Sequence, residues 1–259
     1  MSSLVTMFLL SGLVIFCMMI ALWLLSLLIK NASIVDIFWG LGFVLVAWVN
    51  YLLSPFISPA KLLMTILVTV WGLRLALHIG IRNWGKPEDF RYAKWRQENG
   101  PRWWWVSFFK VFLLQGIIMW IVSAPIISII VTDGIPPLSP LALLGGLVWA
   151  YGFFFEAVGD WQLARFIANP TNKGKLMTTG VWKYTRHPNY FGDAAQWCGF
   201  YLIALASGGW WTIFSPLIMT FLLVRVSGVA LLERTMKNKP GYQEYMKRTN
   251  AFVPWFPKK

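Results

Sequence analysis

The sequence predicts an all-α, polytopic integral membrane protein. Apolar residues make up 58% of the 259 residues, whereas charged residues make up 13%, about half of the share usual in soluble domains. Apolar runs of roughly 20 residues, long enough to cross a bilayer as helices, recur along the chain. This hydropathy excludes nucleic acid as the partner behind the net charge of +13. We expect one membrane domain over residues 1–259.

The apolar runs predict seven membrane-spanning helices, with the N-terminal run retained as a helix. They cover Leu4–Ile29, Ile34–Leu53, Leu62–Ile81, Val106–Val131, Leu141–Leu163, Asn189–Ala206 and Trp211–Leu232.

Basic residues indicate which side each connection faces. Most of the 23 Lys and Arg residues lie in Arg82–Arg102, in the connection after the fifth span and in the C-terminal tail, whereas Thr132–Pro140 and Ser207–Trp210 contain none. By the positive-inside rule the basic segments are cytoplasmic. An odd number of spans then places the N-terminus outside and the C-terminus inside. We expect the functional site to face the cytoplasm, and the family resemblance given below implies a bacterial inner membrane.

Ionisable residues within the expected spans gather in the cytoplasmic halves, where they are functional candidates because burying a charge is costly. Arg74 and His78 lie four residues apart, so they share a helix face and offer a cationic, proton-donating wall to an anionic ligand. The alternative is structural. Arg74 would then pair with a buried carboxylate such as Asp36 or Asp160, and His78 would be a satisfied core residue.

The polar chemistry of the chain converges on Gly180–Trp197. Arg186 and His187 precede Pro188, whose fixed φ suits the first turn of a helix. Both side chains therefore lie beside unpaired backbone N–H groups, a position that suits a phosphate. An interfacial cap that meets lipid headgroups fits the same spacing.

This segment also carries a recognisable pattern. The residues Trp182, Arg186 to Tyr190, Gly192 and Asp193 form W-x-x-x-R-H-P-N-Y-x-G-D. The pattern resembles the C-terminal signature of the steroid 5α-reductase-like membrane reductases, and it is similar to those of the sterol C14-reductases and the isoprenylcysteine carboxyl methyltransferases. The resemblance implies NADPH-dependent reduction of an activated C=C bond in a steroid-like or other lipid. The Lys and Arg residues of the loops suit a 2′-phosphate, and so NADPH over NADH.

The resemblance further implies a C-terminal cofactor-binding half, residues 141–259, and substrate-side helices in residues 1–105. Asp160 matches a carboxylate that binds cofactor in the family, and the tail after Gly241 matches a segment that closes over the cofactor. An interfacial amphipathic tail is the alternative. The expected cofactor contacts are Asp160, Lys175, Trp182, Tyr184, Arg186, His187, Asn189, Tyr190, Asp193, Glu233, Tyr242 and Tyr245. No metal site is expected, because the two His and two Cys residues lack ligand spacing.

The substrate side departs from the family pattern, because the second span reads IVDIFWG where the steroid reductases carry a Gln-Glu pair. Asp36, Arg74 and His78 are therefore the expected catalytic residues, with Asp36 donating the proton or orienting His78 to do so. The expected partners are membrane lipids and a lipid-like substrate that enters from the bilayer. The loop Glu88–Tyr92 is predicted to be a salt-bridged structural turn.

Two other functions compete with a reductase. A methyltransferase could bind S-adenosylmethionine at the same motif, but that donor needs few phosphate partners and the loops are rich in Lys and Arg. A non-catalytic lipid-binding protein would have no need of the acid–base residues.

Overall fold

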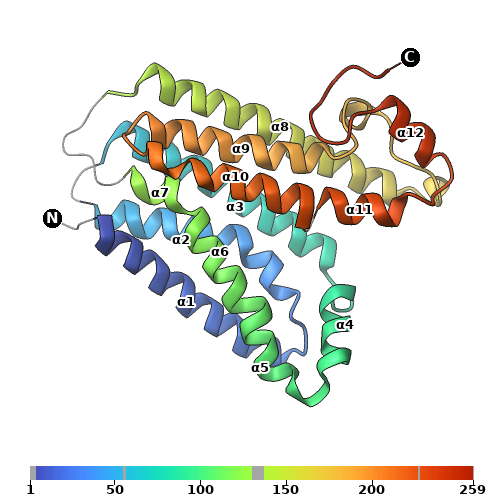
Figure 1. Ribbon diagram of the computed structural model, residues 1–259, viewed down its shortest axis with the longest axis horizontal. Helices are drawn as coiled ribbons and strands as arrows, with labels where there is room; N and C mark the ends of the chain where they lie inside the picture. The colour runs from blue at the N-terminus through green and yellow to red at the C-terminus, as the bar shows by residue number, and fades with distance from the viewer. Residues whose placement is uncertain (1–3, 55–56, 130–136, 227, 259) are drawn as a thin grey trace. The chain divides into compact units, whose positions relative to one another are not determined.

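A computed structural model describes residues 4–54, 57–129, 137–226 and 228–258, and every regular element in these ranges is helical (Figure 1). The prediction of an all-α protein is confirmed. Within the described ranges, six helical stretches are long and apolar enough to cross a membrane. They are α1 (Leu4–Leu28), α2 (Ile34–Leu53), α3 (Pro59–Asn83), the stretch Phe90–Val122, α8 (Pro140–Ala168) and the stretch Trp210–Met236.

The remaining expected span forms α9 (Pro188–Leu205), which is not among the six. Its first half carries Asn189, Asp193 and Gln196, and polar side chains of this kind lower the hydropathy of a helix. The number of crossings and the placement of the N-terminus outside therefore remain predictions.

Two of the expected spans are interrupted helices. The fourth, expected over Val106–Val131, is formed by the end of α5 (Trp103–Ser107), the π-helical η2 (Phe108–Leu113), α6 (Leu114–Val122) and α7 (Ala124–Ser128), and its last residues lie outside the described ranges. The helix α4 (Phe90–Asn99) and η1 (Gly100–Arg102) precede it, within the connection Arg82–Arg102 that was expected to be a loop. The seventh consists of η5 (Trp210–Ile213), α10 (Phe214–Phe221), the π-helical η6 (Leu222–Val226) and α11 (Val229–Met236). The shorter elements are η3 (Pro170–Asn172), η4 (Gly180–Lys183) and α12 (Tyr242–Arg248).

The chain divides into two compact units. Unit 1 comprises Met1–Ala142 and Ile203–Thr212, and unit 2 comprises Leu143–Leu202 and Ile213–Lys259. Residues 203–212, which were expected in the C-terminal half, belong to unit 1.

In unit 1, α2 and α3 cross at backbone contact. A Cβ on Gly40 would lie 2.7 Å from the carbonyl oxygen of Gly72, so only glycine allows this approach. The rings of Phe43 and Trp71, both buried, lie 5.7 Å apart beside the crossing. The crossing sets the first turn of α2, which carries Asp36, beside the C-terminal part of α3.

In unit 2, α8 and α9 lie side by side (Figure 1) and also meet through glycine. A Cβ on Gly152 would lie 2.5 Å from the carbonyl oxygen of Gly192. Two turns further along, Gly159 of α8 packs against Pro188, the first residue of α9. The two helices therefore bring the Trp182–Asp193 motif against the C-terminal part of α8, where Phe155, Val181 and Trp182 form a small buried core.

Candidate functional site

The motif begins in η4, which is fastened to α8 by two hydrogen bonds. The indole Nε1 of Trp182 donates to the carbonyl oxygen of Gly159 over 3.0 Å, and the backbone N–H of Val181 donates to Oε1 of Gln162 over 3.0 Å. Gly180 adopts a φ of 62° against the Gln162 side chain, a conformation that favours glycine. The start of the motif is therefore held rigidly on the last turns of α8.

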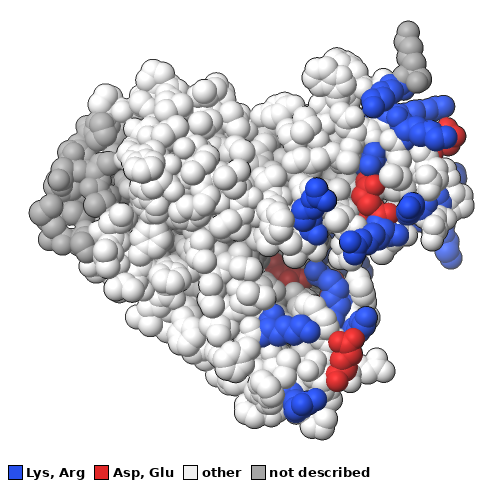
Figure 2. Space-filling view, in the orientation of Figure 1, with Lys and Arg blue, Asp and Glu red and all other residues white. Residues whose placement is uncertain are grey.

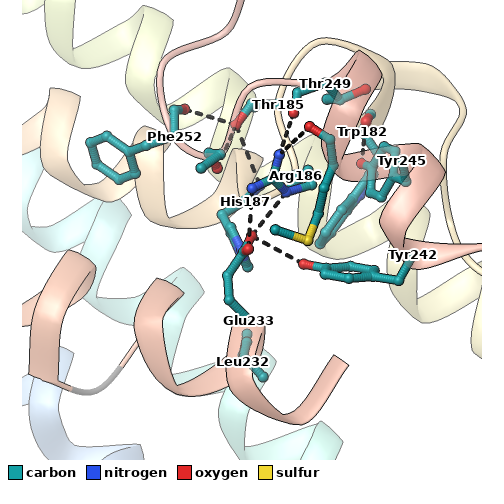
Figure 3. A network of polar contacts seen from close by, with 12 residues as sticks. Trp182, Thr185, Arg186, His187, Leu232, Glu233, Tyr242, Tyr245, Thr249 and Phe252 are labelled. Atoms are coloured by element: carbon teal, nitrogen blue, oxygen red, sulfur yellow. Dashed lines mark hydrogen bonds and ion pairs between the residues drawn. The ribbon is translucent and has the colours of Figure 1, made fainter. Parts of the chain in front are cut away.

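Arg186 forms the centre of a polar network (Figure 3). Its Nε and Nη2 lie 2.9 Å and 3.1 Å from the two carboxylate oxygens of Glu233 on α11. Its Nη1 donates to the carbonyl oxygens of Met246 and Thr249, at the end of α12. The side chain is only 7% exposed. Arg186 therefore links the motif to α11 and α12, and a phosphate would have to compete with these protein acceptors.

His187 and Tyr242 hydrogen-bond to the same carboxylate. The His187 Nε2 and the Tyr242 hydroxyl each lie 3.0 Å from Oε1 of Glu233. Burial lowers the pKa of His187 and outweighs the opposing effect of Glu233, so the ring is neutral near neutral pH and its Nε2–H donates. Burial and the charge of Glu233 raise the pKa of Tyr242 to about 12, so the phenol keeps its proton. Glu233 is thus surrounded by donors.

The segment after α12 lies along the backbone of the motif. The N–H of Arg186 donates to the carbonyl oxygen of Asn250 over 2.9 Å, and the Thr185 hydroxyl donates to that of Phe252 over 2.8 Å. The Tyr245 hydroxyl donates to the carbonyl oxygen of Trp182. Thr185 was not predicted from the sequence, although it lies within the motif, because its partners follow it by more than 60 residues.

A second polar pair joins α9 to α8. The Asn189 amide donates to Oδ1 of Asp160 over 3.0 Å, so two expected cofactor residues are in contact. Asp193, also expected, follows one turn later and is buried. The ring of Tyr190 stacks on His187 at 5.8 Å, which connects this pair to the network around Glu233.

Gln196 extends this face of α9, and it was not predicted from the sequence. Its Nε2 donates to the buried carboxylate of Glu156, whereas its Oε1 is buried without a hydrogen-bond partner among the described residues. The spacing Asn189, Asp193, Gln196 is that of one helix face, and a polar stripe of this kind is the signal that would have found it.

Two expected cofactor residues lie apart from both groups. Lys175 is exposed in the loop before η4, and its side chain joins neither network in the described part of the chain. The ring of Tyr184 faces Phe256 at 6.2 Å, edge to face. Tyr184 lies outside both networks because Trp182, two residues earlier, occupies the position that faces α8.

The expected catalytic residues Asp36, Arg74 and His78 belong to unit 1, on α2 and α3. Oδ1 of Asp36 accepts a 2.7 Å hydrogen bond from the Tyr92 hydroxyl, and its Oδ2 lies 3.4 Å from Nη2 of Arg91. Asp36 is therefore paired with Arg91, and the structural alternative, in which Arg74 pairs with a buried carboxylate such as Asp36 or Asp160, stays a prediction.

Gln115 completes the surroundings of Asp36, because its amide donates to the Tyr92 hydroxyl over 3.2 Å. Neither Tyr92 nor Gln115 was predicted as a site residue. They reach Asp36 from α4 and α6, and only the folded chain brings these helices to the start of α2.

The predicted salt-bridged turn at Glu88–Tyr92 is confirmed. Glu88 pairs with Arg96 at 2.8 Å and accepts the backbone N–H of Ala32 at 2.6 Å. Asp89 pairs with Arg91 at 2.9 Å. Burial raises the pKa of Asp89, but the hydrogen bonds and charge of Arg91 outweigh it and leave the pKa lowered. The turn therefore fastens the start of α4 to the start of α2.

Comparison with known proteins agrees with the motif. A family model described as "protein of unknown function (DUF1295)" matches residues 22–249. The chain belongs to this family. DUF1295 proteins form part of the steroid 5α-reductase-like superfamily, so the resemblance inferred from the motif is confirmed.

Individual relatives of this DUF1295 protein are distant. An uncharacterized protein of Schizosaccharomyces pombe is 27% identical over 90% of the chain and 75% of its own length. The 3-oxo-5-alpha-steroid 4-dehydrogenase 1 of Mus musculus is 28% identical over 45% of the chain and 43% of its own length. A probable O-methyltransferase of Ustilaginoidea virens is 31% identical over 45% of the chain and 36% of its own length. No solved structure matches. The chain therefore spans less than half of either named enzyme.

Proposed function

We propose that this DUF1295 protein is an NADPH-dependent membrane reductase that saturates an electron-poor C=C bond of a steroid-like or other lipid. The observation that carries the proposal is the contact between Asn189 and Asp160, 3.0 Å apart. Both were expected to bind cofactor from the resemblance alone, and they come from different helices. Distant similarity to a steroid 4-dehydrogenase supports the same reaction class.

The donors and acceptors of unit 2 fit a dinucleotide. Asp160 and Asn189 supply an acceptor and an amide that suit ribose hydroxyls and a carboxamide. The buried Oε1 of Gln196, without a partner in the described part of the chain, leaves an acceptor on the same face of α9. Lys and Arg side chains gather over α11 and α12 and the C-terminal segment of unit 2 (Figure 2), where they suit phosphates.

Arg186 has a different role in this proposal from the one its spacing suggested. Four of its N–H contacts go to Glu233, Met246 and Thr249, so we assign it to holding α11 and α12 on the motif. In this proposal the phosphates of NADPH bind to exposed Lys and Arg residues instead. His187, neutral and bonded to Glu233, is a positioning residue for the same carboxylate.

When bound, NADPH supplies a hydride. The protein must then supply a proton and polarise the carbonyl conjugated to the alkene. Asp36 and Tyr92 are joined by a 2.7 Å hydrogen bond, which the Tyr92 hydroxyl donates. We assign proton delivery to this pair and polarisation of the carbonyl to Arg74 and His78.

Ligand binding to the purified full chain tests this function. Thermal unfolding in detergent is measured with NADPH, NADH and S-adenosylmethionine, since a ligand at a hundred times its Kd stabilises a protein by about 2.7 kcal/mol. NADPH should raise the Tm more than NADH, and S-adenosylmethionine should leave it unchanged. A rise in Tm with S-adenosylmethionine alone would instead favour a methyltransferase. This is the second candidate function, and the similarity to an O-methyltransferase supports it. No response to any of the three would favour a lipid-binding protein.

A further inference from the structure

The segment that follows α12 presents large apolar side chains to the outside of unit 2. Val253, Trp255 and Phe256 are all exposed, and Phe256 is 75% exposed. Phe252 turns the other way, and its ring meets that of Phe191 at 5.9 Å. The rings of Trp255 and Phe256 lie 6.4 Å apart. The segment therefore has an inner face packed on the protein and an outer aromatic face.

This outer face is held in place by the backbone. The N–H of Trp255 donates to the carbonyl oxygen of Tyr184 over 2.9 Å, and the N–H of Lys258 donates to that of Arg248 over 2.8 Å. Pro254 and Pro257 restrict φ on either side of the two aromatic residues. Trp255 and Phe256 are thus displayed in a fixed position, although the surrounding contacts bury neither of them.

Helix α8 is long enough to carry the segment to the depth of lipid headgroups. Its anchor, the motif, contacts Gly159 and Gln162 in the last turns of α8, within roughly 14 Å of the helix end. A helix of 29 residues is about 43 Å long and exceeds the hydrocarbon core of about 30 Å. Trp161, exposed at this level, stacks with the guanidinium of Arg165 at 5.0 Å. Such a pair is typical of the membrane interface.

Exposed basic residues neighbour the aromatic face in the chain and across its backbone hydrogen bonds. Lys183, Arg248 and Lys258 are exposed in the same part of unit 2, and Figure 2 shows Lys and Arg side chains gathered over the C-terminal segment and α12. Basic residues beside interfacial aromatics favour a leaflet that carries anionic lipids.

We propose that Val253–Phe256 is a membrane-surface anchor, which inserts Trp255 and Phe256 among the headgroups of anionic phospholipids. The anchor would hold the last residues of the chain, and with them the network around Arg186, against the bilayer. It goes beyond the proposed reductase function and would operate with or without a cofactor.

Depth-dependent quenching tests the anchor. The full chain, with Cys17 and Cys198 replaced by Ala, receives a single cysteine at Phe256 (Phe256→Cys) that carries an environment-sensitive fluorophore. The matched control is Gln243→Cys, an exposed position on α12. In phosphatidylglycerol vesicles, headgroup-nitroxide lipids should lower the emission at position 256 roughly threefold more than at position 243. Iodide in the aqueous phase should quench the fluorophore at position 243 more strongly than the one at position 256.

Other outcomes overturn the proposal. Equal iodide quenching at both positions would mean that the segment lies in water. Protection from both quenchers would mean that protein, such as a second copy of the chain, covers it. Lys183→Gln with Lys258→Gln should reduce the nitroxide quenching in phosphatidylglycerol but not in phosphatidylcholine, and an equal effect in both would refute the preference for anionic lipids. Trp255→Cys provides a second labelled position should Phe256→Cys not fold.

Discussion

Arg186 and Glu233 form a bidentate ion pair, with Nε–Oε1 and Nη2–Oε2 distances of 2.9 Å and 3.1 Å, between residues 47 positions apart. The pair joins the Trp182–Asp193 motif to α11, and the same guanidinium reaches the carbonyl oxygens at the end of α12. Two helices and the C-terminal segment therefore depend on one buried cation.

Removal of the carboxylate should destabilise the protein strongly. In Glu233→Ala the guanidinium of Arg186, 7% exposed, is left without its counter-ion, which typically costs about 3–5 kcal/mol. Thermal unfolding in detergent measures the loss. Glu244→Ala is the control, because Glu244 makes only exposed pairs with Lys247 and Arg248, worth about 0–1 kcal/mol. Equal effects of the two changes would contradict the buried role of the pair.

Stability should fall on mild acidification because of His187. Burial lowers the pKa of this ring in the folded protein, whereas the unfolded chain binds a proton at about pH 6.5. The folded state then binds fewer protons, so its full stability is present above about pH 6.5 and is lost as the pH falls toward the folded pKa. The Tm measured across this range should slope downward for the wild type. His187→Gln, which keeps a donor for Glu233, should flatten the slope, and an unchanged slope would exclude His187 as its source.

Topology can be tested by labelling from either side of the membrane. The charge pattern predicts that cysteines placed at Asp133 and at Lys94 react from opposite sides. Asp133 lies outside the described residues, and Lys94 is an exposed residue of α4. Cys17 and Cys198 are free and exposed on their helices, so both are first replaced by Ala. Reaction of both positions from the same side would refute the seven-span topology.

Sequence patterns predicted the features that depend on neighbouring residues, such as the bounds of helices. The bounds of α2 match the apolar run Ile34–Leu53, whereas α3 begins earlier than expected, at Pro59, because Ser58 caps it by accepting the N–H of Lys61. The π-helical segments η2 and η6 were not predicted, because apolar periodicity does not distinguish a π-bulge from a regular turn.

In the candidate site, too, relationships between neighbouring residues were predictable from the sequence, whereas long-range contacts were not. Asn189 and Asp193 share a helix face at a spacing visible in the sequence. Long-range partners leave no such pattern: Asp36 meets Tyr92 across 56 positions, and Arg186 meets Glu233 across 47. Composition identified the charged residues, but only packing decides which of them neutralise one another.

Cofactor binding should depend on Asn189. Asn189→Ala removes the amide that bonds Asp160 at 3.0 Å, and we expect NADPH affinity to fall at least tenfold, about 1.4 kcal/mol. Titration of the purified protein gives the Kd. Asn238→Ala, an exposed change in the turn before α12, serves as the control. A Kd that is the same in both variants would place the dinucleotide elsewhere.

The proton-delivering pair gives the most demanding prediction. Reduction of a conjugated alkene needs an acid at the carbonyl end, and Asp36 with Tyr92 offers one through a 2.7 Å hydrogen bond. Asp36→Asn and Tyr92→Phe should each leave NADPH affinity nearly intact while lowering turnover roughly a hundredfold or more. Assays use NADPH oxidation with candidate lipid enones.

A structural role for Asp36 predicts a different result. If the pair only ties α4 to α2, both substitutions should lower the Tm and leave turnover per folded molecule unchanged. Asp36→Asn removes the carboxylate that lies 3.4 Å from Arg91, and Tyr92→Phe removes the hydroxyl that donates to Asp36. Glu98→Gln is the matched control, because Glu98 forms an exposed pair with Lys94 at 3.8 Å on the same helix. Well-folded Asp36→Asn and Tyr92→Phe proteins with wild-type turnover would remove both residues from the mechanism and leave His78 as the remaining proposed acid.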